Sequence, residues 1–254
     1  MTGIEATRRD ADTEAMLGVG HGVVARGLER LQLVRDARLR VGRLAIVLAT
    51  TTWLPLLVLS ILEGVAWGSH VQVPFVMDYL PYGQLLIAIP VLVLGELTVA
   101  RYLLLSVAEL RSSEVLNSSD TPKLDVLAAS TVSRWRGRTV NAVMLFLTLV
   151  ATAVSVWGAR EWLTGGWQVA GDEMTMAGWW YLVVSLPVLR FLALRWLWRL
   201  ILWAWFLWRI SRLELNPRPP HPDRAGGLAF LGGTQAVFGV LVFAFGVQLS
   251  CLIA

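Results

Sequence analysis

Residues 179–212 read WWYLVVSLPVLRFLALRWLWRLILWAWFLWRISR. A helix rises about 1.5 Å per residue, so about 20 apolar residues cross a hydrocarbon core of roughly 30 Å, and this stretch is longer than that. The run also carries Arg190, Arg195 and Arg199. Each arginine near the middle of a spanning helix costs about 2.5–3.5 kcal/mol. We therefore predict a membrane-spanning helix whose arginine side faces protein or water instead of lipid.

The three arginines do not share one face of this helix. Successive residues advance about 100°, which places Arg195 and Arg199 close together and Arg190 nearly opposite Arg199. A voltage sensor repeats arginine at every third position, so the spacing excludes that class. Five tryptophans lie around and below the arginines: Trp196, Trp198, Trp203, Trp205 and Trp208. We expect Arg199 to extend to the cytoplasmic surface beside this aromatic belt, and Arg190 to stay inside the bundle.

The composition is that of a membrane protein. Of 254 residues, 56% are hydrophobic and only 16% are charged, whereas soluble domains average about 45–50% apolar and 25% charged residues. Arginine supplies 21 of the 22 basic residues, and their positions follow the predicted membrane boundaries, so we expect no nucleic-acid partner. The predicted fold class is all-α, a polytopic helical membrane protein.

Hydropathy predicts about five transmembrane helices joined by short polar segments. Their approximate ranges are Leu44–Leu62, Gly83–Leu105, Val140–Trp157, Trp179–Leu207 and Gly226 to the end of the chain. Residues 1–43 form a basic cytoplasmic arm, and residues 44–254 form the transmembrane domain with a cytoplasmic helical segment at 106–138. Within that segment Asp120-Thr121-Pro122 predicts a helix start, because it places a capping residue before a proline of the first turn.

The basic residues outside the spans predict the topology. Eight precede the first span, five lie between the second and third, and four follow the fourth, whereas Arg160 alone lies between the third and fourth spans. The positive-inside rule therefore places the N-terminus in the cytoplasm. The arm at 23–41 mixes apolar residues with arginines, so it is either a basic amphipathic helix on anionic lipids or a segment that only sets topology.

Two predicted spans carry faces suited to helix packing. Asn141, Thr148, Thr152 and Ser155 form one polar stripe on the third span, and such small polar residues usually join helices. In the last span Gly232, Gly239 and Gly246 recur every seven residues. We expect this glycine face to pack against a neighbouring helix, either within the chain or from a second copy or partner subunit. The chain stops at Ala254 without a polar flank, so we expect a natural continuation or a subunit contact there.

Glu96 is the only carboxylate deep inside a predicted span. It lies about 21 Å along its helix from Tyr82, while Arg190 and Arg195 lie roughly 16 and 24 Å from Trp179 on the fourth span. Because both helices run inward, we predict an ion pair of Glu96 with the fourth span, with Arg195 preferred over Arg190. The competing interpretation is a protonated, hydrogen-bonded Glu96 with separate arginines. Glu96, Arg190, Arg195 and Arg199 are the candidate intramembrane ligand site.

The sequence offers little for catalysis or for metal binding. His70 and Asp78 are two potential metal ligands without a third, so we predict a solvated loop there. Cys251 is the only cysteine, which excludes an internal disulfide. The phosphate-binding, nucleophile and zinc-protease motifs are all missing. We therefore predict no catalytic residue, no metal and no cofactor.

Three segments carry a resemblance to other proteins. They are LPLLVLSILEG at 54–64, AGWWYLVVSLPVLRFLALRWLWRLILWAWFLWRISRLEL at 177–215 and HPDRAGGLAFLG at 221–232. Together they resemble an uncharacterised group of bacterial multi-span membrane proteins, with the HPDRAGGL turn as the most distinctive element. The resemblance implies a multi-span fold in the bacterial inner membrane and a chain that continues beyond Ala254. It implies no activity and no cofactor.

Three functions are compatible with the sequence. A channel or transporter, or a subunit of one, would explain ionisable residues inside a bilayer, and its buried cations favour an anion such as a phosphate or a lipid head group. A membrane scaffold or assembly subunit would use the basic arm and the 106–138 segment as partner surfaces. An intramembrane enzyme needs a nucleophile or a metal set, which the dispersed histidines do not provide. The first function is our preferred hypothesis and the second is the alternative.

Overall fold

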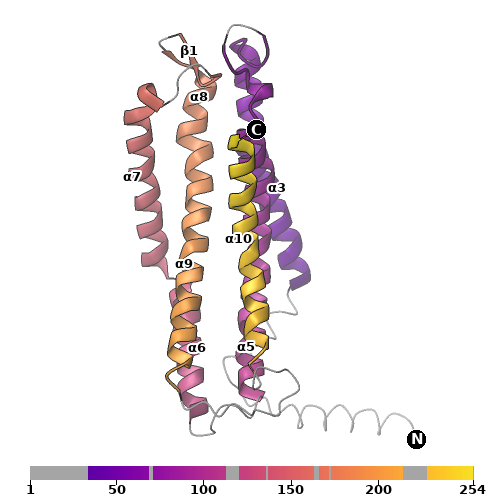
Figure 1. The fold of residues 1–254 in the computed structure, drawn as a ribbon, viewed down its shortest axis with the longest axis vertical. Helices are drawn as coiled ribbons and strands as arrows, with labels where there is room; N and C mark the ends of the chain where they lie inside the picture. The colour runs from indigo at the N-terminus through magenta and orange to yellow at the C-terminus, as the bar shows by residue number, and fades with distance from the viewer. Residues whose placement is uncertain are drawn as a thin grey trace, which may run out of the picture.

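The computed structural model describes residues 34–68, 71–112, 120–135, 137–162, 166–171, 173–213 and 228–253. Long helices stand side by side in one elongated bundle (Figure 1). The long helices are α3 (Val34–Leu62), α5 (Ile89–Ser112), α6 (Thr121–Trp135), α7 (Arg138–Trp162), α9 (Leu186–Ile210) and α10 (Phe230–Ile253). A hairpin of β1 (Val169–Ala170) and β2 (Glu173–Met174) lies at the upper end of the bundle, and α6 lies at its lower end (Figure 1).

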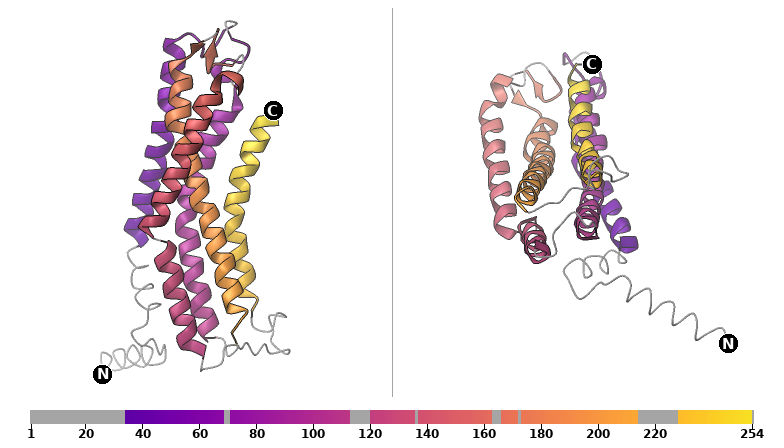
Figure 2. Two further views of the ribbon diagram at one scale, coloured as in Figure 1. Left: turned by 90° about the vertical axis from the view of Figure 1, so that its left-hand side faces the viewer. Right: turned by 60° about the horizontal axis from the view of Figure 1, so that its bottom comes forward.

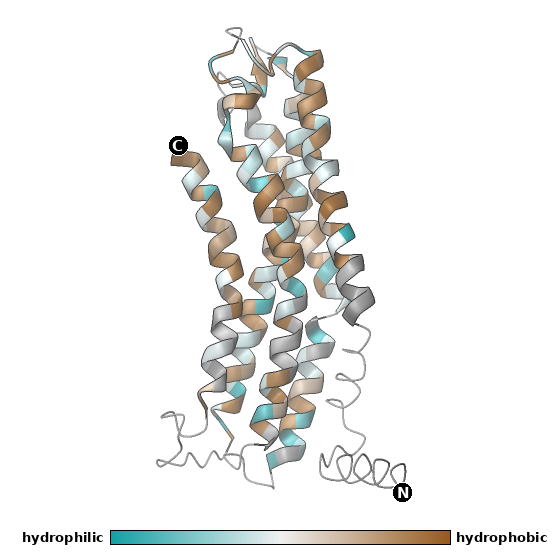
Figure 3. Ribbon diagram, turned by 90° about the vertical axis from the view of Figure 1, so that its right-hand side faces the viewer, coloured by the Kyte–Doolittle hydropathy of each residue, from teal (hydrophilic) through white to brown (hydrophobic). Residues whose placement is uncertain are grey.

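Four helical stretches are long and apolar enough to cross a membrane. They are Val41–Leu62, Tyr79–Glu96, Arg138–Gly158 and Met176–Ile210. The mostly helical fold is confirmed, and these stretches match the first four predicted spans. For the fifth, α10 contributes the shorter apolar stretch Val237–Ile253 within the described residues. Most of the C-terminal half of α10 is hydrophobic, whereas hydrophilic residues are frequent around α6 (Figure 3).

The helix boundaries refine the predicted organisation. α3 begins at Val34 and runs through the predicted boundary between arm and membrane domain, while residues 1–33 lie outside the described residues. α6 begins at Thr121, as the Asp120-Thr121-Pro122 sequence predicts, and Asp120 accepts a hydrogen bond from Lys123 Nζ at 2.7 Å. The predicted cytoplasmic segment therefore consists of the end of α5 followed by α6. The HPDRAGG turn lies outside the described residues.

The bundle has two levels. The lower ends of α3 and α7 lie at a similar height, and α5, α9 and α10 extend below them (Figures 1 and 2). α6 follows beneath α7 and packs beside the lower half of α9. We call the part that contains α6 and the lower ends of α5, α9 and α10 the lower layer. Within this layer, α6 is shorter and more polar than the four apolar stretches that are long enough to cross a membrane.

The upper loops pack against each other instead of lying free in solvent. Phe75 and Trp167 are fully buried and contact edge to face, with ring centroids 5.0 Å apart. Trp167 Nε1 donates to Asp78 Oδ2 at 2.9 Å, and Asp78 Oδ1 accepts from Leu80 N at 3.0 Å. The predicted solvated loop is therefore only partly correct: Asp78 satisfies the N–H of the buried Trp167, whereas its neighbour Met77 is 68% exposed. His70 lies outside the described residues.

Two parts of the chain repeat one local design. Asp78 and Thr175 each cap a short helical turn, α4 (Tyr79–Pro81) and α8 (Met176–Trp180). A π-helix follows each turn: η2 (Tyr82–Ala88) leads into α5, and η4 (Tyr181–Ser185) leads into α9. The second residue of both following helices is proline, Pro90 and Pro187. A proline cannot donate to the carbonyl four residues earlier and its ring crowds that turn, which a widened π-turn relieves.

The two copies have the same register and the same direction. Gln84 in η2 and Tyr181 in η4 are 97 residues apart, and Tyr181 Oη donates to Gln84 Oε1 at 2.6 Å. Pro90 and Pro187 are separated by the same interval. α5 and α9 both run from the upper to the lower end (Figure 1). Residues 78–92 and 175–189 thus form a short parallel internal repeat whose two copies meet at η2 and η4.

Candidate functional site

One carboxylate joins two guanidinium groups between the repeated helices. Glu96 on α5 accepts from Arg195 on α9, with 3.2 Å between Oε2 and Nη2. Its other oxygen, Oε1, lies 2.8 Å from Nη2 of Arg199. The predicted pairing of Glu96 with Arg195 is therefore present, and a second arginine completes a three-residue charge cluster. We call Glu96, Arg195 and Arg199 the charge triad.

The helix geometry explains why both arginines reach Glu96. Arg195 and Arg199 are four residues apart, so they lie on one face of α9 about one turn from each other. Trp196 between them fixes the contact with α5, because its Nε1 donates to Leu92 O at 2.9 Å. Gly95 permits this close approach, since a Cβ there would lie 2.7 Å from Trp196 Cζ2.

The three charges differ in their access to the surroundings. The exposed fraction of the side chain is 4% for Arg199, 24% for Glu96 and 33% for Arg195. The guanidinium of Arg199 also lies 5.6 Å from the ring centroid of Trp196. Arg199 is thus the fixed partner of Glu96, and Arg195 is the accessible one.

The prediction that the Arg199 side chain extends to the cytoplasmic surface is wrong. Its side chain turns into the bundle because Glu96 offers a counter-charge at the same depth. α9 also continues as far as Ile210, so Arg199 lies well inside the helix and not near its end. Only a charge close to a helix end reaches the surface by extending along the helix.

Arg190 lies apart from the triad and binds a different helix. Its Nη1 donates to Ala151 O at 3.1 Å, and its Nη2 donates to Ser155 Oγ at 2.8 Å, both on α7. Thr148, on the same stripe, is 1% exposed. The polar stripe of α7 is predicted to join helices, and its residue Ser155 contacts α9 through Arg190. The candidate cluster of four residues separates into the triad and a distinct Arg190 contact.

The glycine face of α10 is open within the described chain. A Cβ added at Gly232, Gly239 or Gly246 would meet nothing within 4 Å. The close contacts of α10 use glycines of its neighbours. A Cβ on Gly95 of α5 would lie 2.7 Å from Val240 Cγ1, and one on Gly83 of η2 would lie 2.5 Å from Cys251 Sγ. The expected packing of the α10 glycine face is therefore not found inside the chain, and packing against a second copy stays a prediction.

Sequence reasoning missed two polar contacts near the upper end. Tyr181 and Gln84 are both buried and join the two π-helices. Ser185 Oγ donates to Thr52 O at 2.8 Å, which ties the end of η4 to α3. The only sequence signal for these contacts is the shared Pro-Val-Leu at Pro90 and Pro187, from which the register of the repeat can be counted.

The charge triad is suited to binding an anion. Two guanidinium groups and one carboxylate leave a net positive charge, and guanidinium groups bind carboxylate or phosphate oxygens through paired N–H donors. An anion that replaces Glu96 at the accessible Arg195 would leave Glu96 paired with Arg199. Among the described residues, no three His, Cys, Asp or Glu side chains are grouped to hold a metal ion.

Comparison with known proteins adds no further information about this site. No protein-family model, no curated protein and no solved structure matches the chain.

Proposed function

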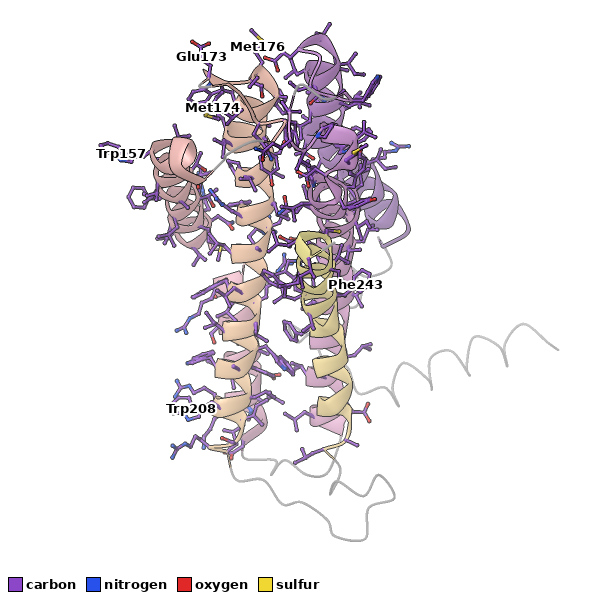
Figure 4. The ribbon with its side chains drawn as sticks, turned by 45° about the horizontal axis from the view of Figure 1, so that its top comes forward. Trp157, Glu173, Met174, Met176, Trp208 and Phe243 are labelled. Carbon is purple, nitrogen blue, oxygen red and sulfur yellow. The ribbon has the colours of Figure 1, made fainter. Side chains whose placement is uncertain are left out.

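We propose that this chain is a multi-pass protein of the bacterial inner membrane with its N-terminus in the cytoplasm. Four helices of spanning length support the membrane location. Trp157, which is 92% exposed, points away from the bundle near the upper end of α7, and Trp208 lies near the lower end of α9 (Figure 4). Trp179 and Trp208 are 29 residues apart, which is about 44 Å of helix and matches a bilayer of roughly 40–45 Å with its head groups.

Within this membrane we propose a channel or transporter, or a subunit of one, that moves a small anion. The observation that carries the proposal is the charge triad. Arg195 and Arg199 lie about 24 and 30 Å below Trp179 along the helix, well away from the upper interface. Ionisable side chains at such depth are costly and usually mark a transport path or binding site. The net positive charge of Glu96, Arg195 and Arg199 favours an anion over a cation.

The repeat supports movement around this site. Transporters built from parallel repeats hold their substrate between the two copies, and the triad joins α5 of one copy to α9 of the other. Each copy has a π-helix and a proline above the triad, and π-helical turns in other proteins often occur at functional sites. We expect the upper segments η2 and η4 to change their packing while the lower parts of α5 and α9 stay together.

Anion flux into liposomes containing the purified full chain tests the proposal. We expect Arg195→Ala to abolish the flux of chloride, phosphate or a small carboxylate that the wild-type chain conducts. Arg43→Gln is the matched control, because Arg43 is exposed at the lower end of α3 and does not touch the triad. A folded Arg195→Ala protein with undiminished flux, or a wild-type chain that moves none of these anions, contradicts the transport function.

A scaffold or assembly subunit is the second candidate, and α10 favours it. The open glycine face and exposed side chains such as Val242, which is 72% exposed, leave much of this helix without a partner in the described chain. A second copy or a partner subunit would cover it, since small residues permit close helix approach in membranes. The basic arm would bind anionic lipids, a prediction that lies mainly outside the described residues. A stable oligomer without anion flux would favour this second function.

A further inference from the structure

A cavity of about 670 Å³ lies in the lower layer between α6 and the end of α9. Its cationic lining residues are Lys123, Arg134, Arg209 and Arg212, and among the described residues no acidic side chain lines it. Lys123 forms an ion pair with Asp120 at 2.7 Å, which leaves the three arginines as the main positive charge of the cavity. This cavity is separate from the charge triad, because Arg209 follows Arg199 by almost three helical turns.

An aromatic ring holds two of these arginines in place. The guanidinium of Arg134, from α6, lies 4.5 Å from the ring centroid of Trp205, and that of Arg209, from α9, lies 5.4 Å from the same ring. A guanidinium stacked on a ring keeps its N–H donors free at its edge for an oxygen ligand. Because the two like charges share one ring, an anion placed between them would relieve their repulsion.

The remaining lining of the cavity is apolar. Val126, Leu213 and the ring of Trp205 contribute to it, and Val126 is 70% exposed. The cavity also lies next to Trp208, which marks the lower interface of the proposed membrane, so its cations are at the depth of lipid head groups. A free inorganic anion needs only the cations, whereas a phospholipid would use both the cations and the apolar wall.

We propose that this cavity binds the phosphate group of an acidic phospholipid from the cytoplasmic leaflet. Arg134 and Arg209 contact the phosphate oxygens, Arg212 adds positive charge at the rim, and the apolar wall contacts the glycerol and the first acyl carbons. Bound in this way, the lipid would join α6 to α9. The proposal depends on the proposed membrane location but not on anion transport by the triad, which has its own test.

Thermal unfolding of the full chain in a neutral detergent, after removal of native lipid, tests this site. Added phosphatidylglycerol should raise the unfolding midpoint in a concentration-dependent way, since a ligand of the native state stabilises it, whereas phosphatidylcholine should not. Arg134→Gln with Arg209→Gln should weaken the phosphatidylglycerol response by about a hundredfold in concentration, or roughly tenfold for each charge-assisted contact removed. Native mass spectrometry should show one fewer tightly bound acidic lipid on this double variant.

The matched control is Arg43→Gln with Arg138→Gln. Both arginines are exposed, lie at the lower ends of α3 and α7, and are not among the lining residues, so this variant changes the net charge equally. It should respond to phosphatidylglycerol like the wild type. We call the Arg134→Gln/Arg209→Gln protein the cavity variant. If it does not fold, two other proteins replace it: the double lysine variant Arg134→Lys/Arg209→Lys and the single variant Ser130→Asp. The lysine variant should keep most of the response, and the aspartate, which adds a carboxylate to the lining, should remove it.

Three outcomes would overturn the proposal. The first is an equal loss in the cavity variant and in the control variant, which would show a diffuse charge effect. The second is a cavity variant, or Ser130→Asp, that responds like the wild type. The third is stabilisation of the wild type by inorganic phosphate or pyrophosphate at the concentrations at which phosphatidylglycerol acts. If the cavity variant loses this stabilisation, the cavity binds a free phosphate instead of a lipid.

Discussion

At the scale of residues, Glu96 pairs with two guanidinium groups that differ in burial. Arg199 is almost fully enclosed, with 4% of its side chain exposed, whereas Arg195 is 33% exposed. A buried charge that loses its partner destabilises a protein strongly, whereas a charge that reaches water recovers most of the loss. Arg199 therefore has the larger structural role, and Arg195 is the residue available to a ligand.

This inequality predicts different costs for the two substitutions. Glu96→Gln and Arg199→Gln should each lower the free energy of unfolding by about 3 kcal/mol, and Arg195→Gln by about 1 kcal/mol. The Glu96→Gln/Arg199→Gln double variant should cost clearly less than the sum, with a coupling of about 1–3 kcal/mol. Denaturant unfolding in detergent micelles measures all four proteins. Equal costs for the two arginine variants, or strict additivity, would contradict the arrangement.

Arg190 shows a different use of the same residue type. Its guanidinium binds a carbonyl and a hydroxyl of α7, and no carboxylate among the described residues pairs with it. Such contacts satisfy its donors at a helix interface, where small polar residues commonly join membrane helices. Arginines at similar spacing in the sequence thus serve a charge cluster and a helix contact, depending on the helix each one faces.

At the scale of elements, glycine has opposite roles on α5 and α10. Gly95 on α5 lies where a Cβ would come within 2.7 Å of Trp196 and Val240, whereas the glycines of α10 face open space. Close packing makes the first position sensitive to any added atom. The regular spacing on α10 is the more noticeable pattern in the sequence, but the isolated Gly95 is the one that the fold requires.

Alanine substitutions should separate these roles. Gly95→Ala should lower the unfolding free energy by about 1–3 kcal/mol through overpacking against Trp196 and Val240. Gly239→Ala should raise it by up to about 1 kcal/mol, because alanine is the better helix former and nothing opposes its Cβ. Thermal or denaturant unfolding of both variants provides the comparison. A destabilising Gly239→Ala would indicate a partner helix on that face.

Larger side chains test for such a partner directly. Gly239→Leu should leave the fold of a single chain intact but should lower the oligomer fraction if a second copy covers this face. Leu252→Phe adds bulk at an exposed position about 140° around the same helix from Gly239, so it is the control and should change neither property. Size-exclusion chromatography with light scattering measures the oligomeric state. If the oligomer fraction is the same in both variants, the glycine face contacts lipid and not a second copy.

At the scale of the whole molecule, the two ends of the bundle are built differently. The upper end is closed by packed loops, with Trp167 and Phe75 buried and Glu63 accepting from the backbone of Met176 at 2.7 Å. The lower layer extends past α3 and α7 and carries the arginine-lined cavity. Positive charge attracts acidic head groups and stays in the cytoplasm during insertion, which supports the lower layer as the cytoplasmic side.

Cysteine labelling in intact cells should report this orientation. In a Cys251→Ser background, Met77→Cys at the upper end should react with a membrane-impermeant reagent, because Met77 is 68% exposed. Ser133→Cys on α6 is also exposed but should react only after the cells are permeabilised. The reverse pattern would invert the topology and place the lower cavity outside. Labelling of both residues in intact cells would show that the lower layer does not lie in the cytoplasm.

The sequence by itself determined the helices and much of their depth in the bundle. Apolar run length gave the positions of the four helical stretches long enough to cross a membrane, Asp120-Thr121-Pro122 gave the start of α6, and depth counting gave the pairing of Glu96 with Arg195. These properties depend on local chemistry: apolar length, backbone capping and the rise of a helix do not require knowledge of neighbouring helices.

Only the tertiary structure decided which face of each helix meets which neighbour. It turned Arg199 inward to Glu96, assigned Arg190 to α7, and left the α10 glycines open while Gly95 took the close contact. It also brought Gln84 to Tyr181 across 97 residues, which revealed the repeat. Helix rotation and relative height result from the packing of all neighbours together, so a periodic pattern along one segment identifies a face without identifying the residues that will cover it.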